Sequence, residues 1–325
     1  MLSAAYSLSC GTGFTSDHEL TYLNIIAVPA RILARPLQEG ECASVVERLK
    51  KAMSYAALMV HVGGGRIDAR RIRLAVDLAA RFHALLIGIA GRSYLPPFLA
   101  EDRAADAKRN DGERKEMMDV LADMGKTFRA STNQMRNVEW RGIPDDANSI
   151  VAREARAADL VIIGRKQDPH DLYYSLDPGI TILRAGRPVL FVPDEIDPLE
   201  ARRVVVAWKD TREARRAVRD ALPFLQGARE AIIVTVCEHG TESQARTHID
   251  DVEDYLARHK VIVGEKAFLH TEQSIATELL RFAKDERADL IVAGGYGHSR
   301  LDEWVLGGVT RELLSESTLC CLFAH

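Results

Sequence analysis

Short apolar runs alternate with amphipathic segments along most of the chain. Residues 57–90 contain an apolar run, a polar turn, a helix that starts near Asp68 and a second apolar run. Nearly continuous apolar strands that alternate with helices are typical of a parallel sheet covered on both faces. The pattern therefore predicts an α/β, doubly wound, Rossmann-like fold with right-handed crossovers.

The same order of segments occurs twice. Residues 203–236 repeat the pattern of 57–90, with Glu213-Ala214-Arg215-Arg216 where the first copy has Asp68-Ala69-Arg70-Arg71. In each copy a later amphipathic helix leads through Ala-Asp-Leu into a strand that ends at glycine, Gly164 or Gly294. Several matches in one order indicate a tandem duplication.

We therefore expect two doubly wound α/β domains, at residues 53–194 and 203–325, joined by a linker at 195–202. Residues 1–52 match neither copy. One hypothesis is that Met53 is the natural start and the leading segment an over-extended translation. The alternative is an authentic, weakly ordered extension, and intact mass of the natural protein would decide between them.

Composition narrows the class of partner. A net charge of −4 does not suit a protein that grips nucleic acid by its phosphates, and no apolar run approaches the length that spans a bilayer. The five cysteines lack CxxC spacing, and adjacent Cys320 and Cys321 are expected on opposite faces of a strand. We expect a reduced, cytoplasmic protein without nucleic-acid or membrane partners.

Motifs for catalysis or metal binding are missing from the sequence. The ten histidines show no HExxH or HxH spacing, and there is no GxSxG, Walker A or GxGxxG motif. The turn after the first apolar run, residues 62–70, does not match an SGGxDS pyrophosphate loop. His61 and His83 lie within apolar segments and are expected to be buried and hydrogen-bonded. We expect no catalytic residue and no protein-bound metal.

One stretch is a candidate ligand site. Residues 294–310 read GGYGHSRLDEWVLGGVT, with Gly294 closing an apolar strand and two glycine turns that each lead toward a helix. Helix N-termini at the carboxyl edge of a parallel sheet attract phosphate, and glycine lets a ligand approach the backbone. A plain strand-to-helix turn is the alternative.

The paired glycine turns, the phrase ADLIVAGGYGHSRLDEWVLGGVTRELL and the duplicated halves resemble the universal stress protein family in its tandem form. The resemblance covers residues 54–325. It implies five-stranded parallel sheets, pairing of domains through the last strand and, in many members, ATP with Mg²⁺ at the glycine turns.

The resemblance also implies nucleotide-binding residues. They are Ala207, Lys209, Asp210, Val236, Gly294, Gly297, His298, Ser299, Gly307, Gly308, Val309 and Thr310. Two positions depart from the family pattern. Gly308 stands where the family has Ser or Thr, and Lys209 stands where it has Asp, with Asp210 displaced by one residue.

The first copy departs further from that pattern. It lacks the second glycine after Gly164, and Pro178 removes an N–H that would otherwise be available to phosphate. One interpretation of Arg165 and Lys166 is that their side chains attract an anion, but exposed basic residues on a turn are expected to be only solubilising. We therefore expect no ATP in this half.

Together these features predict a non-enzymatic stress-response protein whose second half binds an adenine nucleotide. The first half would act as an internal pseudo-dimer partner, and a homodimer of whole chains is left open. An enzyme of the same superfamily that hydrolyses nucleotides or transfers adenylate is one alternative, and a ligand-free scaffold is another.

Overall fold

The computed structural model describes residues 54–63, 66–93, 110–132, 135–165, 176–195, 198–237, 242–271, 274–297 and 308–325. Their strands are β1 (Ala57–His61), β2 (Leu85–Gly91), β3 (Val138–Ile143), β4 (Leu160–Gly164), β5 (Val189–Val192), β6 (Arg203–Ala207), β7 (Glu230–Val236), β8 (Val263–Leu269), β9 (Leu290–Gly294) and β10 (Cys320–Ala324). Their helices are α3 (Arg66–Phe82), α4 (Asn110–Ser131), α5 (Ala147–Glu154), α6 (Pro178–Arg184), α7 (Arg212–Asp220), α8 (Leu222–Leu225), α9 (Glu242–Arg258), α10 (Ile275–Asp285) and α11 (Gly308–Glu316). The two hypotheses about the natural start of the protein, at residue 1 or at Met53, concern residues that lie outside the described part of the chain.

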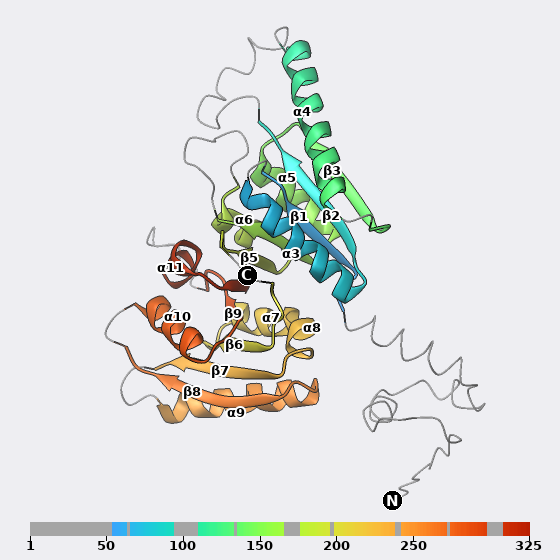
Figure 1. The fold of residues 1–325 in the computed structure, drawn as a ribbon. Helices are drawn as coiled ribbons and strands as arrows, with labels where there is room; N and C mark the ends of the chain where they lie inside the picture. Colours follow the sequence, from blue (N-terminus) through green and yellow to red (C-terminus); the bar gives the residue numbers. More distant parts are fainter. Residues whose placement is uncertain are drawn as a thin grey trace, which may run out of the picture. The chain divides into compact units, whose positions relative to one another are not determined.

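The ten strands form one sheet in the order β3-β2-β1-β4-β5-β10-β9-β6-β7-β8 (Figure 1). Its pairs are parallel except for β5 and β10, where Phe191 lies opposite Cys321 and Val189 opposite Phe323 in antiparallel register. Each copy thus supplies five parallel strands, and the last strand of each joins the two sets. The α/β fold predicted from the sequence is confirmed, including the pairing through the last strand.

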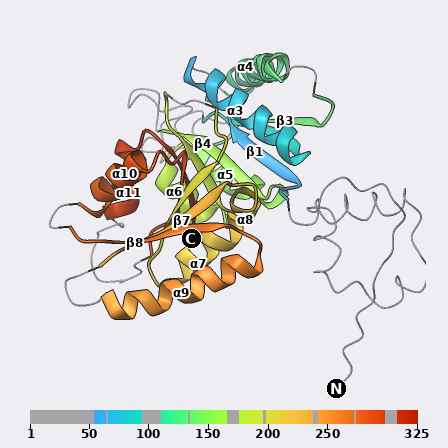
Figure 2. The ribbon, with the colours of Figure 1, turned by 60° about the horizontal axis from the view of Figure 1, so that its bottom comes forward.

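Helices cover both faces of the sheet. α3, α4, α7, α8 and α9 bury apolar side chains against one face, among them Phe128 and Phe224. α5, α6, α10 and α11 do the same on the other face, with Ile182 and Leu313 in its core. Figure 2 shows this arrangement in the second half, where α10 and α11 lie on one side of the sheet and α9 on the other.

Side chains along β10 alternate between the two cores. Cys320 and Leu322 belong to the core under α7, whereas Cys321 and Phe323 belong to the core under α10 and α11. Adjacent cysteines therefore point to opposite faces, as predicted. Cys237, Cys320 and Cys321 are the free cysteines of the described part of the chain, and all three are buried.

The repeated Ala-Asp-Leu segment has a structural reason in both copies. The Asp159 carboxylate accepts the backbone N–H groups of Ala56 and Ala57, at 2.7 and 3.0 Å. Asp289 accepts those of Arg202 and Arg203, at 3.2 and 3.3 Å. Each aspartate thus fixes the start of the first strand of its own copy, and sequence similarity here reflects strand alignment rather than chemistry.

Side chains also join the two halves outside the sheet. The Tyr55 ring, before β1, lies 5.6 Å from the Phe224 ring of α8, and its hydroxyl donates to the backbone oxygen of Asp220 at 2.5 Å. Aromatic contacts of this kind add to the burial of apolar area. The first half therefore packs against the second as part of one core.

The charged region between β2 and β3 is helical in its described part. α4 exposes most of its charged side chains and buries Met117, Leu121 and Phe128. The charged side chains of α4 thus form a solvated helix face. None of the helices in the described residues is long and apolar enough to span a membrane.

Candidate functional site

The predicted site lies at the carboxyl edge of the second half, where β6, β7 and β9 end side by side. Ala207, the last residue of β6, is in register with Val234 of β7 and Ala293 of β9. Gly294 ends β9 beside Ala324 of β10. Parallel strands place their carboxyl ends at one edge, which is where open α/β sheets bind ligands.

Two turns at this edge are joined directly. The backbone N–H of Tyr296 donates to Oγ1 of Thr310 at 3.1 Å, so the turn after β9 is tied to the first turn of α11. Thr310 is buried, and Tyr296 has the left-handed φ of 54°. His298, Ser299 and Gly307 lie outside the described residues.

Two of the glycines pack against the first turn of α7. A methyl group added at Gly294 would lie 2.7 Å from the backbone nitrogen of Ala214, which leaves no room for a side chain. At Gly297 the added methyl would lie 3.2 Å from Oε2 of Glu213. Gly294 is therefore explained by helix packing, without reference to a ligand.

Gly308 is in a different situation. An added methyl group would meet its nearest atom, Oε1 of Glu312, at 3.8 Å, an ordinary van der Waals distance. The space at the N-terminus of α11 would thus accept the Ser or Thr that the family pattern has here. Steric crowding therefore does not explain why this chain has glycine, without a hydroxyl group, at position 308.

The apolar members of the predicted site share one face of the sheet. Ala207, Val236 and Val309 all pack as partly buried residues against the core beneath α10 and α11. They come from the end of β6, the end of β7 and the start of α11. This gives the edge an apolar wall beside the glycine turns, as a planar base would require.

Lys209 and Asp210 do not join that wall. Both are exposed, and Asp210 accepts from Nη1 of Arg215 on α7 at 2.8 Å. The side chain of Asp210 is therefore directed to α7. The resemblance placed them in the site because Lys209 occupies the family's Asp position and Asp210 follows it by one residue. Local spacing does not reveal that Asp210 pairs with a residue of α7.

Sequence reasoning missed Glu213, which the structure brings to the glycine turn. It is buried in the first turn of α7 and forms an ion pair with Arg212. Burial raises the pKa of Glu213, but hydrogen bonds from Arg212, its own backbone N–H and Thr211 outweigh that effect and lower it overall. An ionised carboxylate thus lies beside Gly297, where the sequence predicted phosphate. The available signal was its position as an acid at the start of a helix, a place that also suits an acid because of the helix dipole.

The corresponding edge of the first half holds a buried arginine. A methyl group at Gly164 would collide with Nη1 of Arg71, whose Nε donates to the backbone oxygen of His61 at 3.1 Å. Burial lowers the pKa of Arg71 to about 10, and the Asp194 carboxylate opposes this shift. At the same edge Asp177 caps α6 and accepts the N–H of Ile180 at 3.0 Å. These groups occupy the edge of the first half that corresponds to the glycine turns of the second half.

The expectation that Arg165 is merely solubilising is wrong. Its Nη1 donates to the backbone oxygen of Leu314 at 2.9 Å and also to that of Ser315, and its Nη2 donates to that of Ser317 at 2.9 Å. These carbonyls belong to the end of α11, where helices have unpaired acceptors. Arg165 therefore caps a helix of the other half. Lys166 lies outside the described residues.

The expectation for the two histidines is only partly correct. His61 is buried, but its Nε2 has no hydrogen-bond partner among the described residues. Burial, followed by the charge of Arg71, lowers the pKa of His61 to about 3. His83 is exposed and has φ of 54°, because it ends α3 in a left-handed turn.

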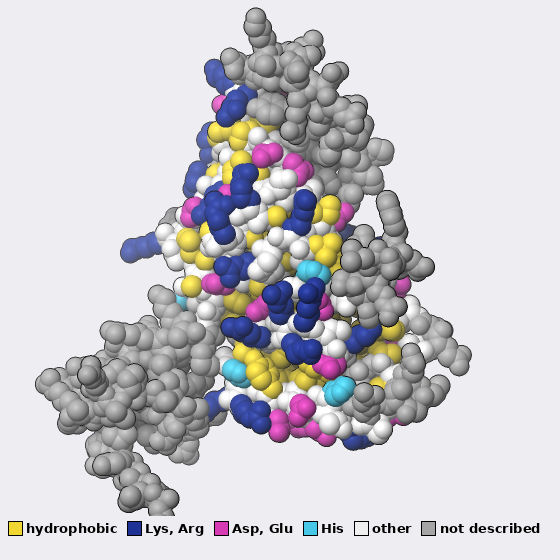
Figure 3. All heavy atoms as spheres, turned by 180° about the vertical axis from the view of Figure 1, so that it is seen from behind, with side chains coloured by type: hydrophobic (Ala, Val, Ile, Leu, Met, Phe, Trp, Pro, Cys, Tyr) yellow, Lys and Arg dark blue, Asp and Glu magenta, His cyan; other side chains and the backbone are white. Residues whose placement is uncertain are grey.

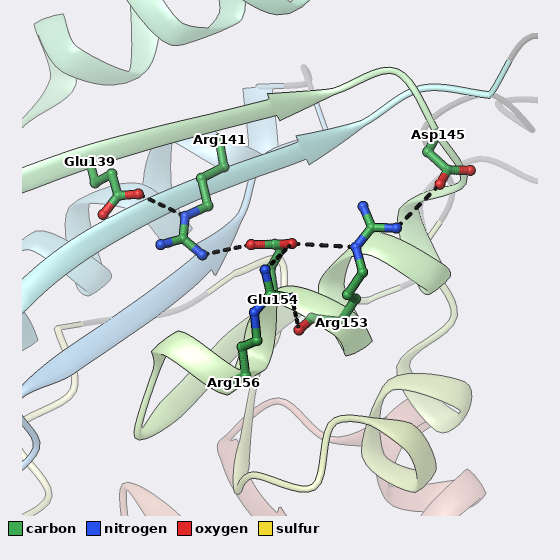
Figure 4. A network of polar contacts seen from close by, with 6 residues as sticks. All are labelled: Glu139, Arg141, Asp145, Arg153, Glu154 and Arg156. Atoms are coloured by element: carbon green, nitrogen blue, oxygen red, sulfur yellow. Dashed lines mark hydrogen bonds and ion pairs between the residues drawn. The ribbon is translucent and has the colours of Figure 1, made fainter.

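A second charged cluster lies away from this edge, between β3 and α5. The Glu154 carboxylate accepts from Nη1 of Arg141 at 2.7 Å and pairs with Arg156 at 3.0 Å and Arg153 at 3.4 Å (Figure 4). Burial raises its pKa, but the three arginines lower it more. Arg141 lies on β3 and so joins the strand to Glu154 at the end of α5, whereas Arg153 and Arg156 are neighbours of Glu154 in the chain. Since every contact of this carboxylate is to an arginine and the contact with Arg141 holds α5 to β3, the cluster is structural.

The described residues hold no group of three or more His, Cys, Asp or Glu side chains that suits a metal ion.

The model of the universal stress protein family matches residues 200–323. No curated protein sequence matches the chain. Among solved structures, a universal stress protein from Archaeoglobus fulgidus DSM 4304 has a TM-score of 0.60, with 14% identity over 82% of this chain and 94% of that chain. A protein described as functionally unknown from Pseudomonas aeruginosa PAO1 has a TM-score of 0.51, with 14% identity over 85% of this chain and 93% of that chain.

At 14% identity these structural similarities show the fold alone. Because they cover 82–85% of this chain, they show the same fold for both halves. Residues 200–323 therefore belong to the universal stress protein family, in a chain whose described residues have the fold of its tandem members.

Proposed function

We propose that the second half binds an adenine nucleotide at the carboxyl edge of β6, β7 and β9. The observation that carries the proposal is the hydrogen bond from Tyr296 to Thr310, which joins the two glycine turns. The base would lie against Ala207, Val236 and Val309, and the phosphates would face the open N-terminus of α11 at Gly308. Mg²⁺ would accompany the phosphates.

Under this proposal the protein is a nucleotide-dependent sensor or interaction module of the stress response, and not an enzyme. Among the residues described at this edge there is neither an activated nucleophile nor an acid–base pair, which supports binding without turnover. The buried Arg71 in the first half supports assigning the nucleotide to the second half alone.

The turn after β9 also contacts the first half of the chain. A methyl group at Gly295 would lie 2.6 Å from Cγ2 of Ile182, and one at Gly179 would collide with the hydroxyl of Tyr296. The turn that would hold the nucleotide therefore rests on α6 of the first half. A ligand that shifts this turn would act on the joint between the halves, which gives a physical basis for a sensor.

Mass spectrometry of nucleotide released from the purified, denatured full chain tests the proposal. We expect ATP or another adenine nucleotide in stoichiometric amount, or its binding by calorimetry when Mg-ATP is added. Gly297→Val should abolish binding, because the added side chain meets Glu213 and Thr211. Gly186→Asn is the matched control, since Gly186 has a left-handed φ of 58° and open space around it.

Two outcomes would replace the proposal. No nucleotide, even after addition of Mg-ATP, would favour a ligand-free scaffold. Steady production of ADP that Gly297→Val abolishes would favour an enzyme.

A further inference from the structure

A cavity lies between α7 and α9, on the opposite face of the sheet from the proposed nucleotide site. Its volume is about 380 Å³, within the range of small-molecule pockets. Trp208 at its base belongs to the core under α7, whereas the preceding Ala207 packs toward α10 and α11. The end of β6 thus separates two distinct sites, and the argument for the cavity does not depend on nucleotide binding.

The cavity walls come from one stripe on each helix. Arg215, Val218 and Arg219 follow at helical spacing on α7, and His248, Asp251, Val252 and Tyr255 do so on α9. Residues three and four positions apart lie on the same side of a helix. Figure 3 shows this face of the second half, with a band of hydrophobic side chains between basic and acidic ones.

Aromatic and aliphatic groups line the middle of the cavity. Trp208 is nine-tenths buried, and its Nε1 has no hydrogen-bond partner in the described part of the chain. Val218 and Val252 are also almost fully buried. Tyr255 is half-buried, with burial raising the pKa of its phenol while the nearby Arg219 charge opposes the shift. Such walls suit a planar aromatic ring.

The charges at the cavity are of both signs. Asp210 and Arg215 neutralise each other in their 2.8 Å pair. Arg219 on α7 and Asp251 on α9 form no ion pair with any described residue, and both are exposed to an occupant. One guanidinium and one carboxylate that are not engaged in an ion pair among the described residues, those of Arg219 and Asp251, therefore line the same cavity from opposite walls.

We infer that this cavity binds the zwitterion of an aromatic α-amino acid. Its ring would lie between Trp208, Val218, Val252 and Tyr255, its carboxylate would meet Arg219 and its ammonium would meet Asp251. Charge-assisted hydrogen bonds to both charged groups, which share the α-carbon of the ligand, would select a zwitterion over a molecule with one charge.

Three probes that share a phenyl ring and a two-carbon chain test this inference. L-phenylalanine carries both charges, 3-phenylpropionate only the carboxylate and phenethylamine only the ammonium. With the full chain, saturation-transfer NMR and calorimetry should show L-phenylalanine binding about tenfold more tightly than either of the others. Equal binding of all three probes, or no binding of any, would overturn the inference.

Two variants test which protein residue binds each charged group of the ligand. Arg219→Gln should weaken L-phenylalanine and 3-phenylpropionate about tenfold and leave phenethylamine unchanged. Asp251→Asn should weaken L-phenylalanine and phenethylamine and leave 3-phenylpropionate unchanged. Arg258→Gln and Asp254→Asn are matched controls, because these exposed residues of α9 pair with each other at 3.6 Å and do not line the cavity.

Circular dichroism and the melting temperature will show whether each variant is folded. Val252→Phe places a larger side chain in the cavity. It should block the binding of L-phenylalanine while Arg219 and Asp251 remain unchanged. Unchanged binding in folded Val252→Phe would count against the site. A change of oligomeric state in Arg219→Gln or Asp251→Asn, without binding of any probe by the wild type, would instead make this face a contact between copies and overturn the inference.

Discussion

The backbone N–H of Tyr296 donates to Oγ1 of Thr310 at 3.1 Å and so ties together two turns that are ten residues or more apart in the sequence. Replacing Thr310 by Val keeps the shape but leaves this N–H without its acceptor. We expect a loss of about 1–2 kcal/mol in the free energy of unfolding, measured by urea denaturation, together with loss of nucleotide binding.

Thr181→Val is the control for that variant, because Thr181 is the corresponding residue of α6 in the first copy. Its Oγ1 donates to the backbone oxygen of Asp177, which already accepts a helical hydrogen bond from Thr181 N–H. This substitution should leave nucleotide binding intact. Equal loss of binding in both variants would contradict a role specific to the second half.

Gly308→Ser should strengthen nucleotide binding. The nearest atom to an added methyl group is 3.8 Å away, so the side chain fits, and its hydroxyl adds a phosphate donor at the N-terminus of α11. We expect the dissociation constant for Mg-ATP to fall about tenfold by calorimetry. Gly308→Ala supplies the control, because it adds the same carbon without the hydroxyl and should leave the constant unchanged.

Glu213→Gln should also strengthen the binding of an anionic ligand, because it removes a negative charge from the site. The Glu213 carboxylate lies beside Gly297, and removing its charge removes repulsion of phosphate. The affinity for Mg-ATP should rise relative to that of the wild type. Because salt screens charge repulsion, this difference in affinity should become smaller when salt is added. Since the acid also interacts with the N-terminus of α7, a stability loss of about 0.3–1 kcal/mol should accompany it. Glu316→Gln, at the other end of α11, should change neither property.

Arg165→Gln should destabilise the protein through a helix of the other half. The variant loses the donors that hold the backbone oxygens of Leu314 and Ser317. We expect a loss of about 1.5–3 kcal/mol in the free energy of unfolding, with faster amide exchange at the end of α11. Arg184→Gln, an exposed substitution on α6, should have little effect. Unaltered exchange in α11 would refute the capping role.

Glu154→Gln should change how stability depends on pH. Because the folded-state pKa of Glu154 lies below its unfolded value, the ionised form stabilises the fold. That contribution is complete above the unfolded pKa of about 4.5 and is lost as pH falls through the folded pKa. Urea denaturation should therefore show a loss of about 1–3 kcal/mol at pH 7 that diminishes below pH 4.5. Glu139→Gln, which removes a more exposed partner of Arg141, should give a much smaller loss, and a difference that is independent of pH would contradict the assignment.

Most of the fold followed from the sequence because strand and helix periodicity is local. The apolar runs became strands, the Ala-Asp-Leu segments fixed strand starts through Asp159 and Asp289, and the position of Cys320 and Cys321 followed from alternation along one strand. The duplication let each copy predict the other. The glycine turns at Gly294 and Gly297 were located by the same logic.

The sequence by itself thus determined the two α/β copies, their sheet edges and the glycine turns. Only the tertiary structure decided what surrounds these turns, because the relevant contacts join residues far apart in the chain. Arg165 meets α11 across about 150 positions, Arg71 covers Gly164, and the cavity at Trp208 exists only where α7 and α9 pack side by side. Local patterns record which residues are buried, but the distance between two helices or the partner of a long charged side chain is set by packing.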